Sequence, residues 1–483
     1  MSDVPDAGVD AVVADLAAAL PGGAVRSGAT ELALYARDAS VIEGEAGVVC
    51  FPTTTAEVQA CVRIARAHGR AVVPRGSGTG LAGGAVPVSD GPPPVVVVTT
   101  KMNRVVSVDP VARVAWVEPG VLNLDLSRAV ADHGLHFAPD PSSQQSCTVG
   151  GNVANNSGGP HCLAYGVTSA HVLAVEVVLP DGEVAVLGGL HPEPEGYDLR
   201  GAFVGSEGTM GIATRIAVRL TPDPPAVRTM LADFPTIEAA GATVTGIIAA
   251  GIVPAALEMM DAPITRAVEA YVGAGFPLDA TAILLVEVDG LPDGVEAMAA
   301  TVTEVAMANG AGGVRVAADA AERALLWKGR RSAFGAIARI APNYYLHDAV
   351  VPRSKLVDVL RQVYEIAGRY DLTMMNVFHA GDGNLHPLIV FDRRVPGVME
   401  RVMAAGREIL HACVAAGGVL SGEHGIGLEK RDYMHLVFTP DDLDAQGRLR
   451  AAFDPDGTCN PLKVLPGGAG CGDVQHVPEG AWI

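Results

Sequence analysis

A glycine-rich stretch directly after a short apolar run places the strongest constraint on the fold of this chain. Five glycines lie within nine residues of the segment Pro74–Gly84, which follows the apolar residues 71–73. A buried strand that leads into backbone without side chains lets successive N–H groups bind an anion such as a pyrophosphate. The segment lacks the Gly-Lys-Ser/Thr of a Walker A loop, and Leu81 stands where the dinucleotide fingerprint needs glycine. It predicts an anion-binding loop of another type, with an ordinary flexible loop as the alternative.

Length and charge narrow the class of protein. At 483 residues the chain exceeds the size of one hydrophobic core, so two or three domains are expected. Hydrophobic residues make up 49% and charged residues 18%, which is typical of a folded chain. The formal net charge of −20 argues against a nucleic-acid or anionic-membrane surface. A local basic pocket for an acidic substrate stays compatible with this charge.

Cysteine usage and the N-terminus indicate a reducing compartment. The chain has seven cysteines and no Cys-x-x-Cys pair, which predicts reduced thiols and excludes the common iron–sulfur motifs. No apolar run has the length of a membrane span. Residues 1–15 are acidic and lack the pattern of a secretory signal. We therefore expect a cytoplasmic protein.

Hydrophobic periodicity predicts an α+β chain. In the N-terminal half, a helix over 54–69, with Thr54 and Glu57 at capping-box spacing, precedes the strand at 71–73, and a hairpin turns at 180–182. The Pro-rich segment 222–225 follows a strand and predicts a domain boundary. In the C-terminal half, helical patterns cover 319–339, 355–369, 397–416 and 441–453. The predicted division is a helical lead-in at 1–45, domains at 46–222 and 223–465, and a loosely held tail at 466–483.

Two further glycine-rich passages have a composition suited to a heterocyclic ligand. One covers 139–159 and the other covers 205–212, where it leads into a strand. Serine, threonine and asparagine can hydrogen-bond the edges of a heterocycle or a polyol chain, and glycine allows close approach. The alternative is that the three passages are unrelated turns. Their common attachment to strands favours one binding site.

The C-terminal half holds a different cluster of chemically active side chains. His379 and His386 are separated by a Gly-rich turn, and Glu423 and His424 lie in a second Gly-bearing loop. Two histidines and one carboxylate form a common divalent-metal set that leaves coordination positions open for substrate, and Zn, Mn and Fe all accept such ligands. The spacing differs from His-Glu-x-x-His, which disfavours a zincin. His161, beside a Gly-Pro pair, is singled out without a role.

Basic and aromatic residues complete the set of candidates. Lys328, Arg330 and Arg331 follow Trp327 in a predicted helix, where most such charges form a solvated face. One of them could reach inward and pair a substrate carboxylate, for which the bidentate fork of arginine is best suited. A pair of tyrosines at 344–345 lies in a strand-like run, where a buried tyrosine is more often part of the core.

Together these motifs resemble a known family. The chain is similar, from about residue 50 to 465, to the FAD-binding subunit family of bacterial glycolate oxidase. That family belongs to the vanillyl-alcohol-oxidase-type flavoproteins, in the branch with D-lactate and D-2-hydroxyglutarate dehydrogenases. The resemblance depends on Arg75-Gly-x-Gly-Thr-Gly, Pro139-Asp-Pro-Ser-Ser, Gly150-Gly-Asn-Val-Ala, Cys162-Leu-x-Tyr-Gly, Gly205-Ser-Glu-Gly, Leu257-Glu-Met-Met-Asp, Gly329-Arg, Asn376–Asn384, Ser421–Gly427 and Phe453-Asp-Pro-Asp-Gly.

The resemblance implies a two-subdomain FAD-binding domain at 46–222 and an α+β cap domain with the metal site at 223–465. FAD would be non-covalent, because the glycine loop carries Ser77 and no histidine. Leu462 replaces a glycine of the family, which affects local backbone contacts. The loop residues implied to hold the pyrophosphate are Arg75, Gly76, Ser77, Gly78, Thr79 and Gly80, with Gly83 beside them. The other implied cofactor-binding residues are Pro139, Asp140, Ser142, Ser143, Thr148, Gly150, Gly151, Asn152, Asn155, Gly158, Gly159, Tyr165, Gly166, Ile212 and Asn460.

The implied reaction is oxidation of a small 2-hydroxy acid, glycolate or D-lactate, to the 2-oxo acid. His379, His386 and Glu423 would hold a divalent metal, and His424 would act as base while hydride passes to flavin N5. Arg330 would pair the substrate carboxylate, and Tyr345 would add a hydrogen bond.

The resemblance also bears on partners and leaves alternatives open. Electrons would leave to oxygen, to a quinone, or to flavin-type and iron–sulfur partner subunits at the inner face of the cell membrane. A homodimer is compatible with the sequence. The alternatives are a stand-alone D-lactate or D-2-hydroxyglutarate dehydrogenase, a metallohydrolase with structural glycine loops, and a subunit that binds FAD only for assembly.

Overall fold

A computed structural model describes residues 7–191 and 196–467, and the chain divides into two compact units. Unit 1 comprises residues 1–157, 167–222 and 423–483, and unit 2 comprises 158–166 and 223–422. The four-part division expected from the sequence stays a prediction. Of the expected tail, residues 468–483 lie outside the described part. No helix in that described part is long and apolar enough to cross a membrane.

The first sheet of unit 1 carries the predicted glycine loop at the end of an edge strand. Its order is β1-β2-β4-β3, with β2, β4 and β3 parallel. The predicted helix is α3, whose apolar face packs with this sheet in one core cluster. Helix α3 begins after Thr54, whose side chain accepts from the N–H of Glu57, as the capping pattern predicts. The elements are α1 (Ala7–Ala19), β1 (Val25–Arg26), α2 (Ala29–Tyr35), β2 (Val48–Cys50), α3 (Thr55–Ala67), β3 (Val72–Arg75) and β4 (Val95–Val98).

The second sheet of unit 1 is antiparallel, with the order β5-β6-β10-β8-β9. The predicted hairpin is confirmed, because β8 and β9 pair across the turn at 180–182. A short pair, β7 with β11, lies beside it. The elements are β5 (Val105–Asp109), β6 (Val114–Val117), α4 (Asn123–Val130), β7 (Leu135–His136), α5 (Val149–Asn155), β8 (Val172–Val178), β9 (Val184–Gly188), α7 (Leu199–Phe203), β10 (Ile212–Arg219), β11 (Thr221–Pro222) and α15 (Pro440–Phe453).

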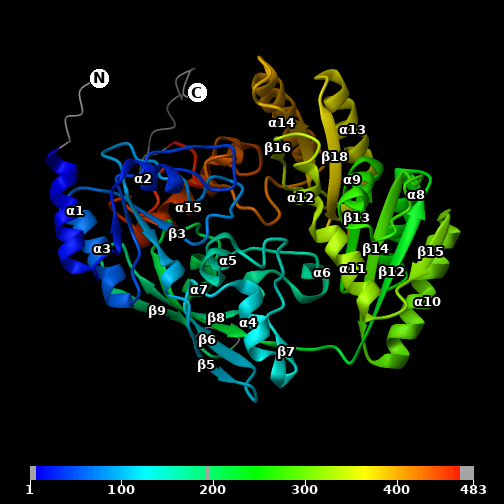
Figure 1. The fold of residues 1–483 in the computed structure, drawn as a ribbon, viewed down its shortest axis with the longest axis horizontal. Helices are drawn as coiled ribbons and strands as arrows, with labels where there is room; N and C mark the ends of the chain where they lie inside the picture. The colour runs from blue at the N-terminus through cyan, green and yellow to red at the C-terminus, as the bar shows by residue number, and fades with distance from the viewer. Residues whose placement is uncertain (1–6, 192–195, 468–483) are drawn as a thin grey trace. The chain divides into compact units, whose positions relative to one another are not determined.

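Unit 2 is built on one antiparallel sheet with the order β15-β12-β14-β13-β18-β19-β17, and β20 joins β18 to β16. Figure 1 labels β12, β13, β14, β15, β16 and β18 of this sheet. The strands are β12 (Ala226–Phe234), β13 (Ala256–Asp261), β14 (Ala282–Gly290), β15 (Gly313–Val316), β16 (Asn343–Leu346), β17 (Ala349–Val350), β18 (Thr373–His379), β19 (Asn384–Leu385) and β20 (Pro387–Phe391). The helices are α6 (Cys162–Tyr165), α8 (Ile237–Ala249), α9 (Ala262–Val272), α10 (Pro292–Ala308), α11 (Ala320–Arg331), α12 (Ala333–Ile337), α13 (Leu356–Arg369) and α14 (Val398–Ala415).

The two faces of this sheet have different chemistry. Side chains alternate along a strand, so Leu257 and Met259 of β13 point into the main apolar core, which α8, α10, α13 and α14 complete. Glu258 lies between them and therefore points to the opposite face. Glu287 of β14 and His379 of β18 share that face, since β14 contributes its even-numbered residues to the core and Glu258 pairs with His379 in register.

Two segments differ from the sequence prediction. The helix expected over 319–339 is broken at Ser332 into α11 and α12. The passage expected as a loop over 139–159 contains helix α5, which begins after Thr148 because this side chain accepts from the N–H of Gly151 at 3.2 Å. A Cβ at Gly150 would lie 2.6 Å from Pro119 Cβ, so that glycine serves close packing of the helix as well as flexibility.

Leu462 provides a test of backbone strain. Its φ is +64°, in the left-handed region where a side chain costs about 1–2 kcal/mol. We expect Leu462→Gly to raise the free energy of unfolding by about 0.5–1 kcal/mol, because glycine removes this strain but adds entropy to the unfolded chain. Urea unfolding measures the change. Leu465→Gly, without a positive φ at that position, should give no gain, and a loss in Leu462→Gly would contradict the strain argument.

Candidate functional site

The three glycine passages converge within unit 1. A Cβ at Gly76 would lie 2.4 Å from Thr148 Oγ1, so the first passage contacts the cap of α5. A Cβ at Gly208 would lie 3.0 Å from Pro74 Cγ, and the N–H of Glu207 donates to the carbonyl of Ala154 at 2.8 Å. Passages far apart in sequence therefore form one backbone-lined region.

Arg75 supports the first glycine loop from inside. Its side chain is buried, lies 5.3 Å from the ring centroid of Tyr35 and donates to the carbonyl of Ala85 at 3.4 Å. A Cβ at Gly78, where φ is +72°, would lie 2.1 Å from Arg75 Nη2. Burial lowers the pKa of Arg75, and Asp38 partly offsets this. The guanidinium thus lies directly under the loop that this residue begins.

The last segment of unit 1 closes over the glycine passages. Asn460 donates through Nδ2 to the carbonyls of Gly84 at 2.8 Å and Glu207 at 2.6 Å. The buried Glu207 carboxylate accepts from the N–H groups of Ile426 at 2.6 Å and Gly427 at 2.8 Å. Asn460 thus lies at the glycine passages, while its cofactor-binding role stays a prediction, and Glu207 joins two of those passages to the 426–427 backbone.

Glu207 predicts an unusual pH dependence of stability. Burial raises its pKa from 4.5 to about 7, although two backbone N–H groups and nearby lysines lower it in part. Between these values the folded state holds a proton that the unfolded state releases, so stability falls as pH rises. We expect Glu207→Gln to remove this slope. As the pH rises from 4.5 to 7.5, the free energy of unfolding of the variant should increase by about 3 kcal/mol relative to that of the natural protein. Urea unfolding at both pH values measures this.

The control for this experiment is Glu183→Gln, because Glu183 is exposed at the turn between β8 and β9. Its unfolding free energy should run parallel to that of the natural protein. If the pH dependence of the unfolding free energy of Glu207→Gln also runs parallel to that of the natural protein, Glu207 does not take up the proton on folding.

Helix α5 connects the second passage to the predicted base. Asn155 donates through Nδ2 to the backbone carbonyl of His424 at 3.0 Å. Asn152 is buried and accepts from Asn123 at 3.0 Å, while Asn123 also donates to the carbonyl of Pro139. Asn155 therefore orients the loop that carries His424, and Asn152 holds the second passage together.

Residues 158–166 belong to unit 2, although the chain before and after them belongs to unit 1. The Tyr165 hydroxyl donates to Asp289 of β14. His161 lies 3.2 Å from Glu287 and stacks against Trp327 with 5.2 Å between ring centroids. His161, for which sequence gave no role, thus belongs to a buried polar cluster. Gly158, Gly159, Tyr165 and Gly166 were predicted to bind cofactor, and this role stays a prediction.

One stripe of α11 meets the polar face of the unit 2 sheet. Arg323, Trp327 and Arg330 recur at helical spacing, so they point the same way. Arg323 and Trp327 donate to Glu287 at 2.7 and 2.6 Å, and Thr229 donates at 2.5 Å. Burial would raise the pKa of Glu287, but His161 and Arg323 hold it well below its usual range.

The third residue of this stripe reaches a second buried carboxylate. Arg330, predicted to bind substrate, is 2% exposed and pairs with Glu258 Oε2 through Nε at 2.7 Å. Glu258 Oε1 lies 2.7 Å from His379 Nδ1. Burial would raise the pKa of Glu258, yet His379 and Arg330 together hold it below its usual value. One carboxylate therefore holds a predicted ligand and a predicted substrate-binding residue.

The predicted second histidine ligand lies beside the first. The rings of His379 and His386 are 5.1 Å apart between centroids, and both side chains are buried. His386 Nε2 lies 3.5 Å from Asp348 Oδ1. Asp348 also accepts from the Ser421 hydroxyl at 2.6 Å and the Gly422 N–H at 3.0 Å. Glu423 and His424 follow Gly422 directly in the chain, where it passes from unit 2 to unit 1.

Tyr345 lies in β16 as predicted, with its ring packed on His347 at 4.7 Å between centroids. Its side chain is 9% exposed, so it belongs mostly to the core of unit 2. Its role toward a substrate stays a prediction.

Sequence reasoning missed the roles of four buried carboxylates, those of Glu207, Glu258, Glu287 and Asp348. Two of them interrupt apolar strand patterns: Glu258 stands between Leu257 and Met259, and Glu287 stands between two valines. A charged residue in such a run is almost never buried without a partner, so its presence there was a usable signal.

The class of protein to which this fold and site belong is given by two sequence profiles. A sequence profile described as "FAD binding domain" matches residues 46–188, and one described as "FAD linked oxidases, C-terminal domain" matches residues 223–464. The chain belongs to the FAD-linked oxidases and is an FAD-binding oxidoreductase. This rules out the alternative of a metallohydrolase with structural glycine loops.

Among individual proteins, the chain is similar to the glycolate oxidase subunit GlcD of Escherichia coli (strain K12), with 45% identity over 90% of this chain and 87% of the relative. GlcD of Bacillus subtilis (strain 168) is 41% identical over 86% of this chain and 88% of the relative. A D-lactate dehydrogenase of Anaerostipes hadrus is 33% identical over 89% and 92% of the two chains. The predicted family resemblance is confirmed.

Solved structures share the overall fold of this chain, and the two matching profiles identify its FAD-binding and C-terminal oxidase domains, so the predicted fold class is confirmed. A p-cresol methylhydroxylase structure aligns with a TM-score of 0.82 over 96% of this chain and 98% of that chain, at 18% identity. An alkyldihydroxyacetonephosphate synthase structure aligns with a TM-score of 0.74 over 95% and 86%, also at 18% identity. At this identity the likeness concerns the fold alone.

Proposed function

We propose that this protein oxidises a small 2-hydroxy acid, glycolate or D-lactate, to the corresponding 2-oxo acid. The observation that carries the proposal is the buried pair His379 and His386 beside Asp348, which holds the Ser421–Gly422 backbone that leads directly into Glu423 and His424. The names of the relatives, glycolate oxidase subunit and D-lactate dehydrogenase, support this substrate class.

The residues of unit 1 fit a non-covalent FAD. At Gly76 and Gly150 a Cβ would meet atoms closer than 3.0 Å, so both passages use glycine for close backbone approach. The loop Arg75–Gly80 offers backbone N–H groups to a pyrophosphate, and the passage from Pro139 to Asn155 offers small polar groups to the flavin and its ribityl chain. When bound, FAD supplies the redox chemistry by accepting hydride at N5.

The donor set of His379, His386 and Glu423 fits a divalent metal such as Zn, Mn or Fe. Imidazole and carboxylate suit these ions, and the buried carboxylate that holds His379 is typical of the surroundings of a histidine ligand. When bound, such an ion lowers the pKa of a substrate hydroxyl as a Lewis acid.

The remaining proposed roles belong to side chains of this chain. His424 takes the proton of the substrate hydroxyl, a task for which an imidazole is suited near neutral pH. Asn155 supports that role by holding the His424 backbone carbonyl. Arg330 pairs the substrate carboxylate while Glu258 anchors its guanidinium, and Tyr345 adds a hydrogen bond.

Electron transfer to a partner is also part of the proposal. The chain has no Cys-x-x-Cys motif that would carry electrons onward through a common iron–sulfur cluster. The relatives named as GlcD are described as subunits. We propose that electrons leave to flavin-type and iron–sulfur partner subunits at the inner face of the cell membrane, with a quinone or oxygen as the alternative acceptor. A homodimer is compatible with this arrangement.

Anaerobic titration of the FAD-loaded protein tests the proposal. Glycolate and both enantiomers of lactate and 2-hydroxyglutarate are added separately, and flavin absorbance is followed with and without chelator. Bleaching by glycolate or D-lactate that is lost with chelator is expected. Preference for D-2-hydroxyglutarate would favour that dehydrogenase alternative, and absence of bleaching with every acid would favour a subunit that binds FAD only for assembly.

A further inference from the structure

Glu258 is in contact with two residues of the proposed site, although sequence reasoning gave it no role. It lies at the centre of β13 with 1% exposure, directly opposite His379 of β18 in the antiparallel register. Its two oxygens have different partners: Oε1 lies 2.7 Å from His379 Nδ1, and Oε2 pairs with Arg330. This carboxylate of β13 is therefore shared between one neighbouring strand, β18, and one helix, α11.

The pairing with Arg330 determines the protonation of His379. A guanidinium is always charged, so a buried partner carboxylate stays ionised and can only accept hydrogen bonds. His379 Nδ1 must then carry the proton that it donates to Oε1. In the neutral ring this leaves the lone pair on Nε2, the atom that a metal-ligating histidine in this state would use.

We infer that Glu258 is a positioning residue that holds His379 in the tautomer with Nε2 available to a metal ion. The inference rests on the proposed function, because it takes His379 as a ligand. Glu258 itself contacts neither metal nor substrate in this role. It acts through the ring that it orients.

The variant Glu258→Gln makes the inference testable, because an amide can be turned either way. The buried Arg330 needs an acceptor, so it draws the amide oxygen to its own side. The amide NH₂ then faces His379 Nδ1, which must accept, and the ring proton moves to Nε2. We expect Zn²⁺ affinity to fall about tenfold to a hundredfold.

Two companion variants separate this effect from general damage. Arg330→Met removes the other partner of the same carboxylate but leaves an acceptor oxygen of Glu258 at His379 Nδ1, so Zn²⁺ affinity should fall less than in Glu258→Gln. Adding Arg330→Met to Glu258→Gln frees the amide oxygen to turn toward Nδ1, so the double variant should recover most of the lost affinity. If Glu258→Gln alone fails to fold, the Zn²⁺ affinity of the double variant still tests the inference.

The measurement is Zn²⁺ competition against a chromophoric chelator in FAD-loaded protein, with urea unfolding in excess chelator to report stability without metal. Weaker binding in Glu258→Gln with recovery in the double variant supports the inference. Unchanged affinity in Glu258→Gln, or equal losses in Glu258→Gln and Arg330→Met, overturns it while the proposed function stands. A natural protein that binds no Zn²⁺ overturns this inference and the proposed metal set together.

Discussion

His424→Ala is expected to lower the turnover of 2-hydroxy acid about a thousandfold while FAD stays bound. A positioned general base contributes about a hundredfold to ten-thousandfold to a rate, and no other described group is assigned this proton. His424 contributes its backbone carbonyl, not its side chain, to the hydrogen bond from Asn155, so the loop should keep its place in the variant. Steady-state kinetics with an artificial electron acceptor and the flavin content of the purified protein measure both parts.

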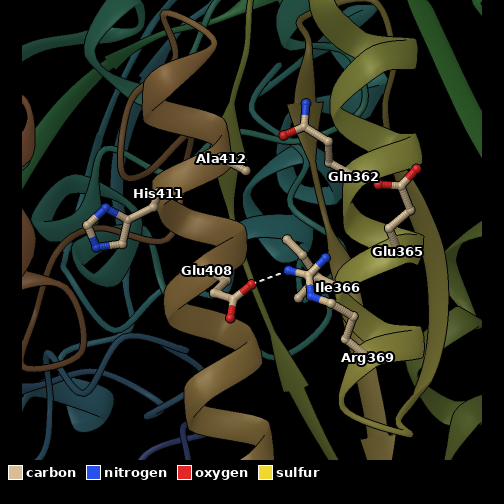
Figure 2. A pocket seen from close by; sticks show the side chains of 7 residues that line it. All are labelled: Gln362, Glu365, Ile366, Arg369, Glu408, His411 and Ala412. Atoms are coloured by element: carbon tan, nitrogen blue, oxygen red, sulfur yellow. Dashed lines mark hydrogen bonds and ion pairs between the residues drawn. The ribbon is translucent and has the colours of Figure 1, made fainter.

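The matched control is His411→Ala. His411 lies on α14 at a shallow groove between α13 and α14, together with Gln362, Glu365, Arg369 and Glu408, and has no role in the proposed reaction (Figure 2). Its replacement should leave turnover within about twofold of the natural protein. Full activity in His424→Ala would refute the assignment of the base, and loss of FAD would show that the loop itself had been disturbed.

Glu287→Ala should lower the free energy of unfolding by about 3 kcal/mol or more. The Glu287 side chain is 2% exposed and accepts from Thr229, Arg323 and Trp327, with His161 as a further partner. Removing one member of a buried charged network leaves its partners without their acceptor, which typically costs about 3–5 kcal/mol. The partly exposed Arg323 can turn to water, so the lower part of this range is expected.

Urea unfolding followed by tryptophan fluorescence suits this experiment, because Trp327 Nε1 donates directly to Glu287. Glu296→Ala is the control: Glu296 forms an ion pair with Arg228 at the surface of the same unit, and such pairs contribute about 0–1 kcal/mol. Similar losses in the two variants would contradict the central place given to Glu287 in this polar cluster.

Several elements could be predicted because their signals are local. The cap of α3 at Thr54, the hairpin turn at 180–182 and the strand that leads into the Gly76 loop each depend on neighbours within a few residues. The break of the predicted helix at Ser332 could not be foreseen in this way. The periodic apolar pattern continues past residue 332, and the change of direction depends on packing against other elements.

The candidate site likewise has residues that local sequence predicted and contacts that depend on the fold. The sequence indicated His379, His386 and the Glu423-His424 pair as candidate site residues, because imidazoles in Gly-bearing loops are typical of metal or catalytic sites. Of the basic residues in the α11 segment, one was expected to reach inward, and it is Arg330, which is buried on Glu258. An acid on β13 and an arginine on α11 are far apart in sequence, and only the sheet register and the helical stripe bring them together.

The amino-acid sequence was sufficient to predict the glycine passages, the histidine motifs and the family with its flavin chemistry. Each of these depends on contiguous residues whose backbone or side-chain chemistry serves few purposes. Which partner each buried carboxylate has was determined by the tertiary structure alone. Glu207 accepts from the 426–427 backbone, Glu287 accepts from Arg323 of α11, and Glu258 contacts both His379 and Arg330. Burying a charge costs several kcal/mol unless a partner meets it, and that partner is chosen by the fold rather than by nearness along the chain.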